Sequence, residues 1–235
     1  MTRALIVAHG QPSDPGMAAR ALDRLADAVA AHLPGWQVGA ATLAEAGQLA
    51  AEAAGEPGVV FPLFMAGGWF TRVHIPERLR AAGAQGWRLL EPFGCSPALH
   101  ELTISIAREC GAGRVLLAAH GSLKSAVPSA IAGHVAARIA AETGKPAAVA
   151  FIDQTPQLQT ATGYGKDAVC LPFFAMEGGH VTEDIPAALE KAGFAGRILP
   201  PVGLDARVPA LIAAAIREGS PICAGACRWS GAQNP

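Results

Sequence analysis

Apolar residues fall into short continuous runs that alternate with longer amphipathic segments. The run at residues 4–8 (ALIVA) has no polar residue within it, which predicts a strand buried on both faces of a parallel sheet. Asp14 before Pro15 is a helix start signal, because an N-cap residue is followed by a first-turn proline. Residues 13–33 predict a helix, since apolar side chains recur with helical spacing at Met17, Leu22, Leu25, Val29 and Leu33.

The same alternation continues to the end of the chain. Strands are expected at residues 36–41, 58–64, 87–90, 114–119, 147–151, 167–174 and 197–200. Helices are expected at residues 43–54, 75–83, 96–110, 129–143, 155–162, 185–193 and 207–219. Strands that alternate with helices predict an α/β fold, in which parallel sheets carry helices on both faces.

The second half of the chain repeats the first. RALIVAHGQP at residues 3–12 matches RVLLAAHGSL at residues 114–123, so that His9 and His120 are 111 positions apart (120 minus 9). FMAGG at residues 64–68 resembles FAMEGG at residues 174–179. The repeat predicts two tandem lobes, residues 1–112 and 113–219, which face a central cleft and precede a tail at residues 220–235.

Composition excludes several classes of protein. The chain has 235 residues, a net charge of −1 and no run of Lys and Arg, so no field gathers nucleic acid. No apolar stretch approaches the roughly 20 residues that a bilayer requires. The five cysteines are mostly scattered, which favours a reducing, cytoplasmic location. Cys223 and Cys227 have no usual metal-site spacing, and we interpret them as part of an ordinary tail.

Candidate chemistry lies where strands end, because ligands of open parallel sheets bind beyond the carboxyl ends of the strands. His120 ends one apolar run, and His180 follows a Gly-Gly turn after another. Glu183 and Asp184 come next; Asp184 is interpreted mainly as a helix cap. Two neutral imidazoles and a carboxylate predict an open divalent-metal site, and they can also accept protons.

The corresponding stretch of the first copy has diverged. In PLFMAGGWFTRVHIP, Trp69 stands after the Gly-Gly pair in place of the histidine, and Arg72 and Val73 replace the acids. His74 appears directly before Ile-Pro. We therefore expect the second lobe to deliver the metal. His9 and His74 are the alternative pair, and a site with residues from both lobes stays open.

These residues resemble a known family. AHGS at residues 119–122, LPFFAMEGGHVTEDIP at residues 171–186 and the tandem halves are similar to the class II chelatases of tetrapyrrole biosynthesis, particularly the long-form sirohydrochlorin chelatases. The resemblance covers nearly the whole chain and implies two flavodoxin-like lobes around a tetrapyrrole cleft. It implies insertion of Co²⁺ or Fe²⁺ into sirohydrochlorin, with the metal as a substrate and no tightly bound cofactor. The metal would be handled by His120 and His180, with Glu183 as the nearby acid.

The resemblance also implies a partner and its contacts. Sirohydrochlorin carries many carboxylates, which local cations would meet. The expected substrate contacts are Arg72, Ser122, Lys124, Gly178 and Gly179. Two fused lobes supply what a dimer of single lobes would, which is consistent with a monomer.

Three other functions are weighed against a chelatase. A metal or tetrapyrrole carrier of the same fold would keep the histidines without turnover. A hydrolase that uses Ser122 beside His120 is disfavoured, because the chain lacks the G-x-S-x-G elbow. A purely structural protein is disfavoured by the histidines and acids retained in the second copy.

Overall fold

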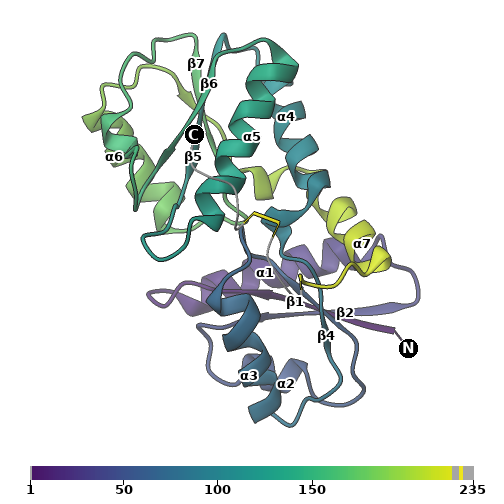
Figure 1. Cartoon of the computed structure of the whole chain (residues 1–235). Coiled ribbons are helices and arrows are strands. Elements are labelled where there is room, and N and C mark those ends of the chain that lie inside the picture. Colours follow the sequence, from purple (N-terminus) through teal and green to yellow (C-terminus); the bar gives the residue numbers. More distant parts are fainter. Residues whose placement is uncertain (1, 224–227, 230–235) are drawn as a thin grey trace. The chain divides into compact units, whose positions relative to one another are not determined.

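The computed structural model describes residues 2–223, 228 and 229 (Figure 1). It contains two four-stranded parallel sheets, with strand orders β2-β1-β3-β4 and β6-β5-β7-β8. Both sheets therefore have the same topology, in agreement with the duplicated sequence. The predicted α/β class and the tandem arrangement of two similar lobes are confirmed. No helix in the described part of the chain has the length and apolar character needed to cross a membrane.

The elements follow one another in the same order in both halves. The strands of the first sheet are β1 (Thr2–Ala8), β2 (Trp36–Thr42), β3 (Val59–Pro62) and β4 (Arg88–Leu89). Those of the second are β5 (Arg114–Ala119), β6 (Ala147–Phe151), β7 (Ala168–Pro172) and β8 (Arg197–Ile198). The α-helices are α1 (Pro15–Ala30), α2 (Gln48–Glu52), α3 (Ile75–Ala81), α4 (Pro97–Glu109), α5 (Val127–Thr143), α6 (Ile185–Lys191) and α7 (Val208–Glu218).

Short helical turns complete each half. A π-helical turn precedes α3 and α6, namely η1 (Phe70–His74) and η4 (His180–Asp184). Single 3₁₀ turns are η2 (Phe93–Cys95), η3 (Leu158–Thr160) and η5 (Val202–Leu204).

The first strand and helix form as the sequence predicts. Residues 4–8 of β1 are all buried, as expected of a strand covered on both faces. The Asp14 carboxylate accepts a hydrogen bond from the Met17 backbone N–H at 3.0 Å, and Pro15 begins α1. Leu22 and Val29 of this helix are fully buried, whereas Met17 is 59% exposed and lies outside the core.

The helix expected at residues 155–162 does not form. Only the 3₁₀ turn η3 is present, and Leu158 is its buried residue. The cause is a competing backbone pairing: the Phe151 N–H donates to the Pro156 carbonyl at 2.9 Å. This bond ties the segment to the end of β6, and it occupies a carbonyl that a helix would need for its own ladder.

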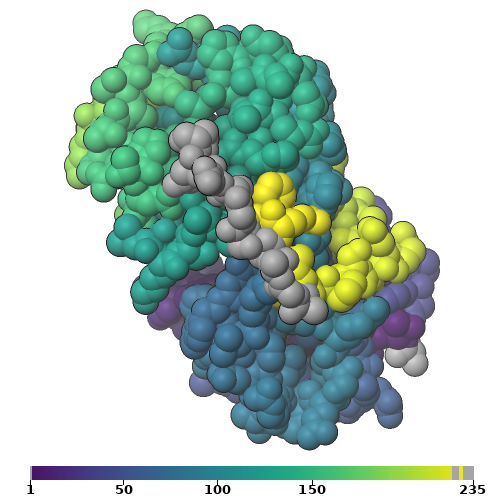
Figure 2. All heavy atoms as spheres, in the orientation of Figure 1, coloured from purple at the N-terminus to yellow at the C-terminus, as the bar shows by residue number. Residues whose placement is uncertain are grey.

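The packing units differ from the predicted lobe boundaries at residues 112 and 219. One compact unit combines the chain up to Ser96 with the segment that begins at Ala206, and the other contains Pro97–Asp205. Thus α4 packs against α5, and α7 packs against α1. In Figure 2 the yellow atoms of α7 lie against purple and blue atoms of the first unit. Each repeat therefore places its last helix in the core of the other unit, which the sequence repeat alone does not reveal.

Two glycines fix the loops that lead to the π-helical turns. The Gly94 N–H donates to the Phe64 carbonyl, and the Gly203 N–H donates to the Phe174 carbonyl, both at 2.9 Å. A Cβ atom at Gly94 would lie 1.9 Å from the Met65 carbonyl oxygen, and one at Gly203 would lie 1.9 Å from that of Ala175. Only glycine allows this close approach, so the loop after β3 or β7 lies directly against the glycine backbone.

Replacing Gly203 by alanine should lower the free energy of unfolding by about 1–3 kcal/mol or more, because the loop after β7 must move to admit the methyl group. Gly133 is the matched control, since a Cβ atom there meets nothing within 4 Å. Gly133→Ala, in the middle of α5, should raise the free energy of unfolding by about 0.5–1 kcal/mol. Guanidinium unfolding followed by circular dichroism measures both; unchanged stability of the Gly203 variant would contradict the close approach.

Candidate functional site

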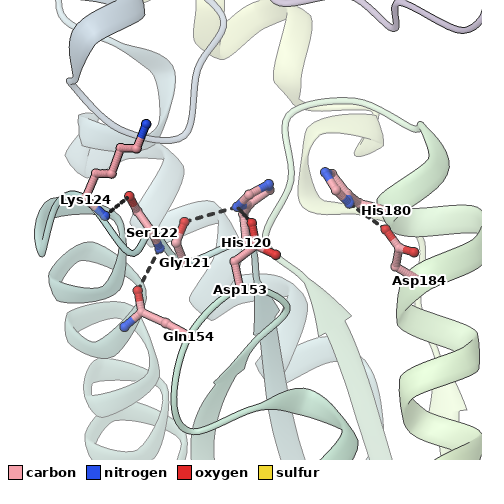
Figure 3. Close-up of polar contacts among 8 residues, drawn as sticks. All are labelled: His120, Gly121, Ser122, Lys124, Asp153, Gln154, His180 and Asp184. Carbon is pink, nitrogen blue, oxygen red and sulfur yellow. Dashed lines mark hydrogen bonds and ion pairs between the residues drawn. The ribbon is translucent and has the colours of Figure 1, made fainter.

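The candidate site of the second lobe lies at the carboxyl ends of three neighbouring strands. In the order β6-β5-β7-β8, the chain passes from one side of β5 to the other, and this switch point is where open α/β sheets bind ligands. His120 directly follows β5, Asp153 follows β6, and His180 begins η4 after β7. Figure 3 shows these side chains together above the strand ends. The topology therefore brings residues from three separate segments into one place.

The two predicted histidines are in ring contact. The ring centroids of His120 and His180 are 4.6 Å apart and the rings are nearly perpendicular, at 89°. Their side chains are 45% and 47% exposed, respectively. The pair is therefore held by the fold and remains open to a ligand from solvent.

Hydrogen bonds determine which ring nitrogens carry protons. The Nδ1 atom of His120 lies 3.1 Å from the Gly121 carbonyl oxygen, and Nδ1 of His180 lies 2.6 Å from Asp184 Oδ2. Carbonyl and carboxylate oxygens only accept, so Nδ1–H is the donor in both rings. A neutral imidazole then has its lone pair on Nε2, the form in which histidine binds a metal.

Asp184 has a different role from the cap that its sequence position suggests. Its side chain makes no hydrogen bond to the start of α6, although it occupies the N-cap position. Its carboxylate instead accepts the hydrogen bond from His180, four residues earlier across the π-helical turn. Glu183 is exposed on the same turn. Asp184 is therefore the acid that orients His180, and spacing of four residues on a helix was the available signal.

Asp153 is a further acid of this site, and the sequence analysis did not single it out. Its Oδ2 atom lies 3.5 Å from His120 Nδ1, and its backbone N–H donates to the His120 carbonyl at 3.0 Å. Both side chains are nearly half exposed, so the pairing contributes little to stability and mainly orients the ring. Asp153 follows the apolar run at residues 147–151, so the rule that selected His120 could also have selected it.

The predicted substrate contacts of the second lobe lie on the two loops that carry the histidines: Ser122 and Lys124 follow His120, and Gly178 and Gly179 precede His180. The Ser122 backbone N–H donates to Gln154 Oε1 at 2.7 Å, and the Ser122 hydroxyl accepts from the Lys124 backbone N–H at 3.2 Å. Lys124 is exposed and lies beyond Ser122 from His120 in Figure 3. Hydrogen bonds of Ser122 to Gln154 and Lys124 thus shape the loop after β5. The ammonium group of Lys124 is exposed to solvent.

The Gly-Gly pair is not a flexible turn. Gly178 accepts hydrogen bonds from Val181 and Thr182, and Gly179 has ordinary helical angles, φ −50° and ψ −38°. In the first lobe Trp69 occupies the equivalent position with φ −55° and ψ −44°. The backbone therefore accepts a large side chain here, and the conformation at Gly179 does not require a glycine.

The structure also corrects the alignment of the two copies. The Arg72 N–H donates to the Gly68 carbonyl, just as the Thr182 N–H donates to the Gly178 carbonyl. The offset is thus 110 (182 minus 72), and Phe70, not Trp69, occupies the position of His180. By the same offset, His74 takes the place of Asp184 (184 minus 74).

The first lobe also lacks a counterpart of Asp153. The Ala44 N–H donates to the His9 carbonyl at 3.0 Å, the bond that Asp153 makes to His120 in the second lobe. Alanine therefore stands where the second lobe has a carboxylate. Of His120, Asp153, His180 and Asp184, only His120 has an identical counterpart in the first lobe. This is His9, whose Nδ1 lies 2.9 Å from the Gly10 carbonyl oxygen.

The alternative pair, His9 and His74, has an aromatic ring against both of its members. The Phe70 ring is 4.7 Å from His9 and 5.7 Å from His74 between centroids, edge-on to each. Arg72, expected to meet substrate carboxylates, donates from Nη1 to the Cys223 carbonyl at 3.0 Å. This end of the first sheet is therefore built mainly from packed rings.

Among the residues with described positions, no group of three or more His, Cys, Asp and Glu side chains is arranged to hold a metal ion. Cys223 is half-buried, and Cys227 lies outside the described residues.

Burial raises the pKa of the Cys170 thiol to about 12, so this cysteine stays protonated in the core.

Comparison with known proteins places this geometry in a family. The model of the CbiX family matches residues 114–219, the repeat that contains both histidines of the pair. A search of curated proteins finds no match.

Solved structures match the whole chain. One is described as CbiX, the terminal enzyme for biosynthesis of siroheme in denitrifying bacteria; it is 44% identical, has a TM-score of 0.86, and the match covers 92% of this chain and 98% of that one. SirB from Bacillus subtilis with Fe³⁺ is 15% identical, with a TM-score of 0.63 and coverage of 94% and 96%. The sirohydrochlorin chelatase SirB from B. subtilis subspecies spizizenii in complex with cobalt is 15% identical, with a TM-score of 0.68 and the same coverage. The SirB likenesses show a shared fold, whereas the full-length identity of 44% shows that this chain belongs to the CbiX family.

Proposed function

We propose that this protein is a sirohydrochlorin chelatase, which inserts a divalent metal into the macrocycle during siroheme or cobalamin biosynthesis. The observation that carries the proposal is the full-length match to the CbiX structure, at 44% identity over 92% of this chain. Siroheme is the iron complex of sirohydrochlorin, so Fe²⁺ is the first metal to test and Co²⁺ the second. The metal and the metal-free ring are both substrates, and no resident cofactor is required.

His120 and His180 receive the metal in this mechanism. Their contacts to Gly121 and Asp184 leave the Nε2 lone pairs for coordination. Two imidazoles occupy two coordination positions, and the others remain for water and then for the pyrrole nitrogens. Ligands that are about half exposed can release the metal to the ring, because they do not enclose it.

Proton transfer falls to the acids and imidazoles of the same edge. Insertion of a divalent metal into the free ring releases two protons from pyrrole N–H groups, and these need an acceptor. Glu183 is exposed on the turn that carries His180, and it is the candidate acceptor. Asp184 keeps the His180 ring oriented while this exchange takes place.

The rim of the substrate supplies the remaining interactions. Lys124 extends an ammonium group into solvent from the loop after β5, where it can pair with a ring carboxylate. Ser122, Gly178 and Gly179 line the same edge with backbone groups. Arg72 uses one N–H on Cys223 and has others for a carboxylate, because a guanidinium carries five.

The histidine pair gives the main test. In anaerobic assays with excess sirohydrochlorin and Fe²⁺ or Co²⁺, followed by absorbance, the wild type should complete many turnovers. Replacing His120 and His180 together by alanine should lower the rate by more than about 100-fold, because both metal ligands are lost. His9→Ala is the matched control, since His9 ends the equivalent strand of the first lobe, and it should keep most of the activity.

The outcomes separate the hypotheses. Loss of turnover only with His9→Ala would keep the activity and move the metal site to the first lobe. Stoichiometric uptake without turnover above the metal-only background would refute the chelatase and favour a carrier of metal or tetrapyrrole.

The two neighbouring acids are distinguished by their contacts. Asp184→Ala removes the acceptor of the His180 Nδ1–H, and the affinity for Co²⁺, measured by calorimetry, should fall by about 10–100-fold. Glu183→Ala removes the same charge one residue away; it should change the Co²⁺ affinity little and lower kcat. Equal loss of Co²⁺ affinity in both variants would show that charge, not orientation of His180, is what matters.

A further inference from the structure

The first lobe has an aromatic cluster in place of the histidine and acids of the second. Phe70 packs edge-on against His9 at 4.7 Å and is stacked with Phe64 at 5.9 Å. Trp69 contacts Phe70 edge-on at 5.1 Å and stacks on His74 at 4.7 Å, with 24° between the planes. The equivalent sheet edge of the second lobe carries polar groups, so the two copies offer different chemistry on the same backbone.

Trp69 is the exposed apolar ring of this cluster, since Phe64 and Phe70 are both partly buried. Its side chain is 57% exposed, although it stacks on His74 and touches Phe70. Exposed apolar surface that is continuous with other rings, at the edge of a sheet where ligands bind, is typical of a binding site. The fold does not require a tryptophan here, since Gly179 occupies the same backbone position in the second lobe with nearly the same φ and ψ.

The rings beneath Trp69 hold it in place. A tryptophan that rests on His74 and abuts Phe70 has little rotamer freedom left to lose when a ligand covers its open surface. An indole offers a flat, electron-rich face, which favours a planar conjugated ring over a flexible aliphatic ligand. The platform defined by Trp69 and His74 is therefore matched in shape to a flat ring system.

A cation lies on the same turn as the platform residue His74. Arg72 belongs to the π-helical turn that ends at His74, and its Nη1 donates to the Cys223 carbonyl at 3.0 Å, which orients the guanidinium. Its remaining N–H groups suit a carboxylate at the rim of a ring. No acid replaces the lost carboxylates at the equivalent positions, which are Ala44, Val73 and His74. An anionic ring is thus favoured over a cationic one.

We propose that the Trp69–His74 platform of the first lobe is a binding site for one face of a planar, carboxylate-bearing macrocycle, with Arg72 at its rim. The inference rests on the proposed function and deepens it, because it names the residues of the first lobe that hold the ring. Duplication then separates two tasks that a single lobe would perform at one sheet edge. Ring affinity depends on Trp69, and metal affinity does not.

The experiment measures metal-free sirohydrochlorin binding under anaerobic conditions by its absorbance change, together with KM, kcat and Co²⁺ affinity. The variants are Trp69→Gly, which copies the second lobe, Trp69→Ala and Trp69→Phe. Trp36→Ala is the matched control, because Trp36 begins β2 at the opposite, amino end of the sheet. Circular dichroism establishes that each variant is folded, and an unchanged Co²⁺ affinity shows that the second lobe is intact.

Trp69→Gly and Trp69→Ala should weaken ring binding roughly 10-fold and raise the KM for the ring to match, with kcat and Co²⁺ affinity little changed. Trp69→Phe should lie between these variants and the wild type, since it keeps a smaller ring. The same weakening with the Co²⁺-loaded ring would assign product as well as substrate to the platform.

Failure has two distinguishable forms. If the wild type turns over sirohydrochlorin and the Trp69 variants bind it as tightly as Trp36→Ala does, the platform is refuted and the chelatase stands. If the wild type neither binds nor metallates sirohydrochlorin, the proposed function is refuted, and the platform with it.

Discussion

Parallel pairing of β5 between β6 and β7 is the constraint on which the functional edge depends. The register pairs Ala119 with Phe151 and Ala118 with Pro172, so the three strands end at nearly the same level. Residues that are far apart in the sequence thereby meet: His120 follows one strand, Asp153 another and His180 the third. A shift of any strand by one residue would exchange its two faces and separate these side chains. The chemistry of the edge is thus a consequence of sheet register.

The duplicated fold separates what the backbone requires from what the chemistry requires. Both lobes keep the strand-end histidine, a π-helical turn and a glycine that admits no Cβ atom against the preceding loop. These shared features are the requirements of the backbone. The positions of Asp153, His180 and Asp184 differ, and the first lobe has Ala44, Phe70 and His74 there. Replacing a few side chains on a conserved frame therefore suffices to change a polar edge into an aromatic one.

Sequence periodicity predicted the α/β class, the strands and most helices, because buried parallel strands and amphipathic helices leave strong local patterns. His120 and His180 were found because each follows an apolar run that predicts a strand, and such a position can be recognised in the sequence. Periodicity did not predict that α4 and α7 pack in the opposite unit, because the choice between two similar partners is made by tertiary packing. The expected helix at residues 155–162 is absent because the Phe151 N–H bonds to the Pro156 carbonyl and ties this segment to the end of β6, which apolar periodicity does not reveal.

The π-helical turn explains why the roles of the site residues were harder to predict from the sequence than the fold. Aligning the copies from their Gly-Gly pairs makes Trp69 the counterpart of His180, whereas the backbone hydrogen bonds make Phe70 the counterpart. The second copy has one more residue between Phe174 and its glycines than the first copy has after Phe64, whereas these phenylalanines and the downstream Ile-Pro all keep the offset of 110. That register also decides which acid orients His180, because Asp184, and not Glu183, ends the five-residue turn that His180 begins. The roles of individual residues in this motif can therefore be assigned only when the hydrogen bonds of the turn are known in addition to its sequence.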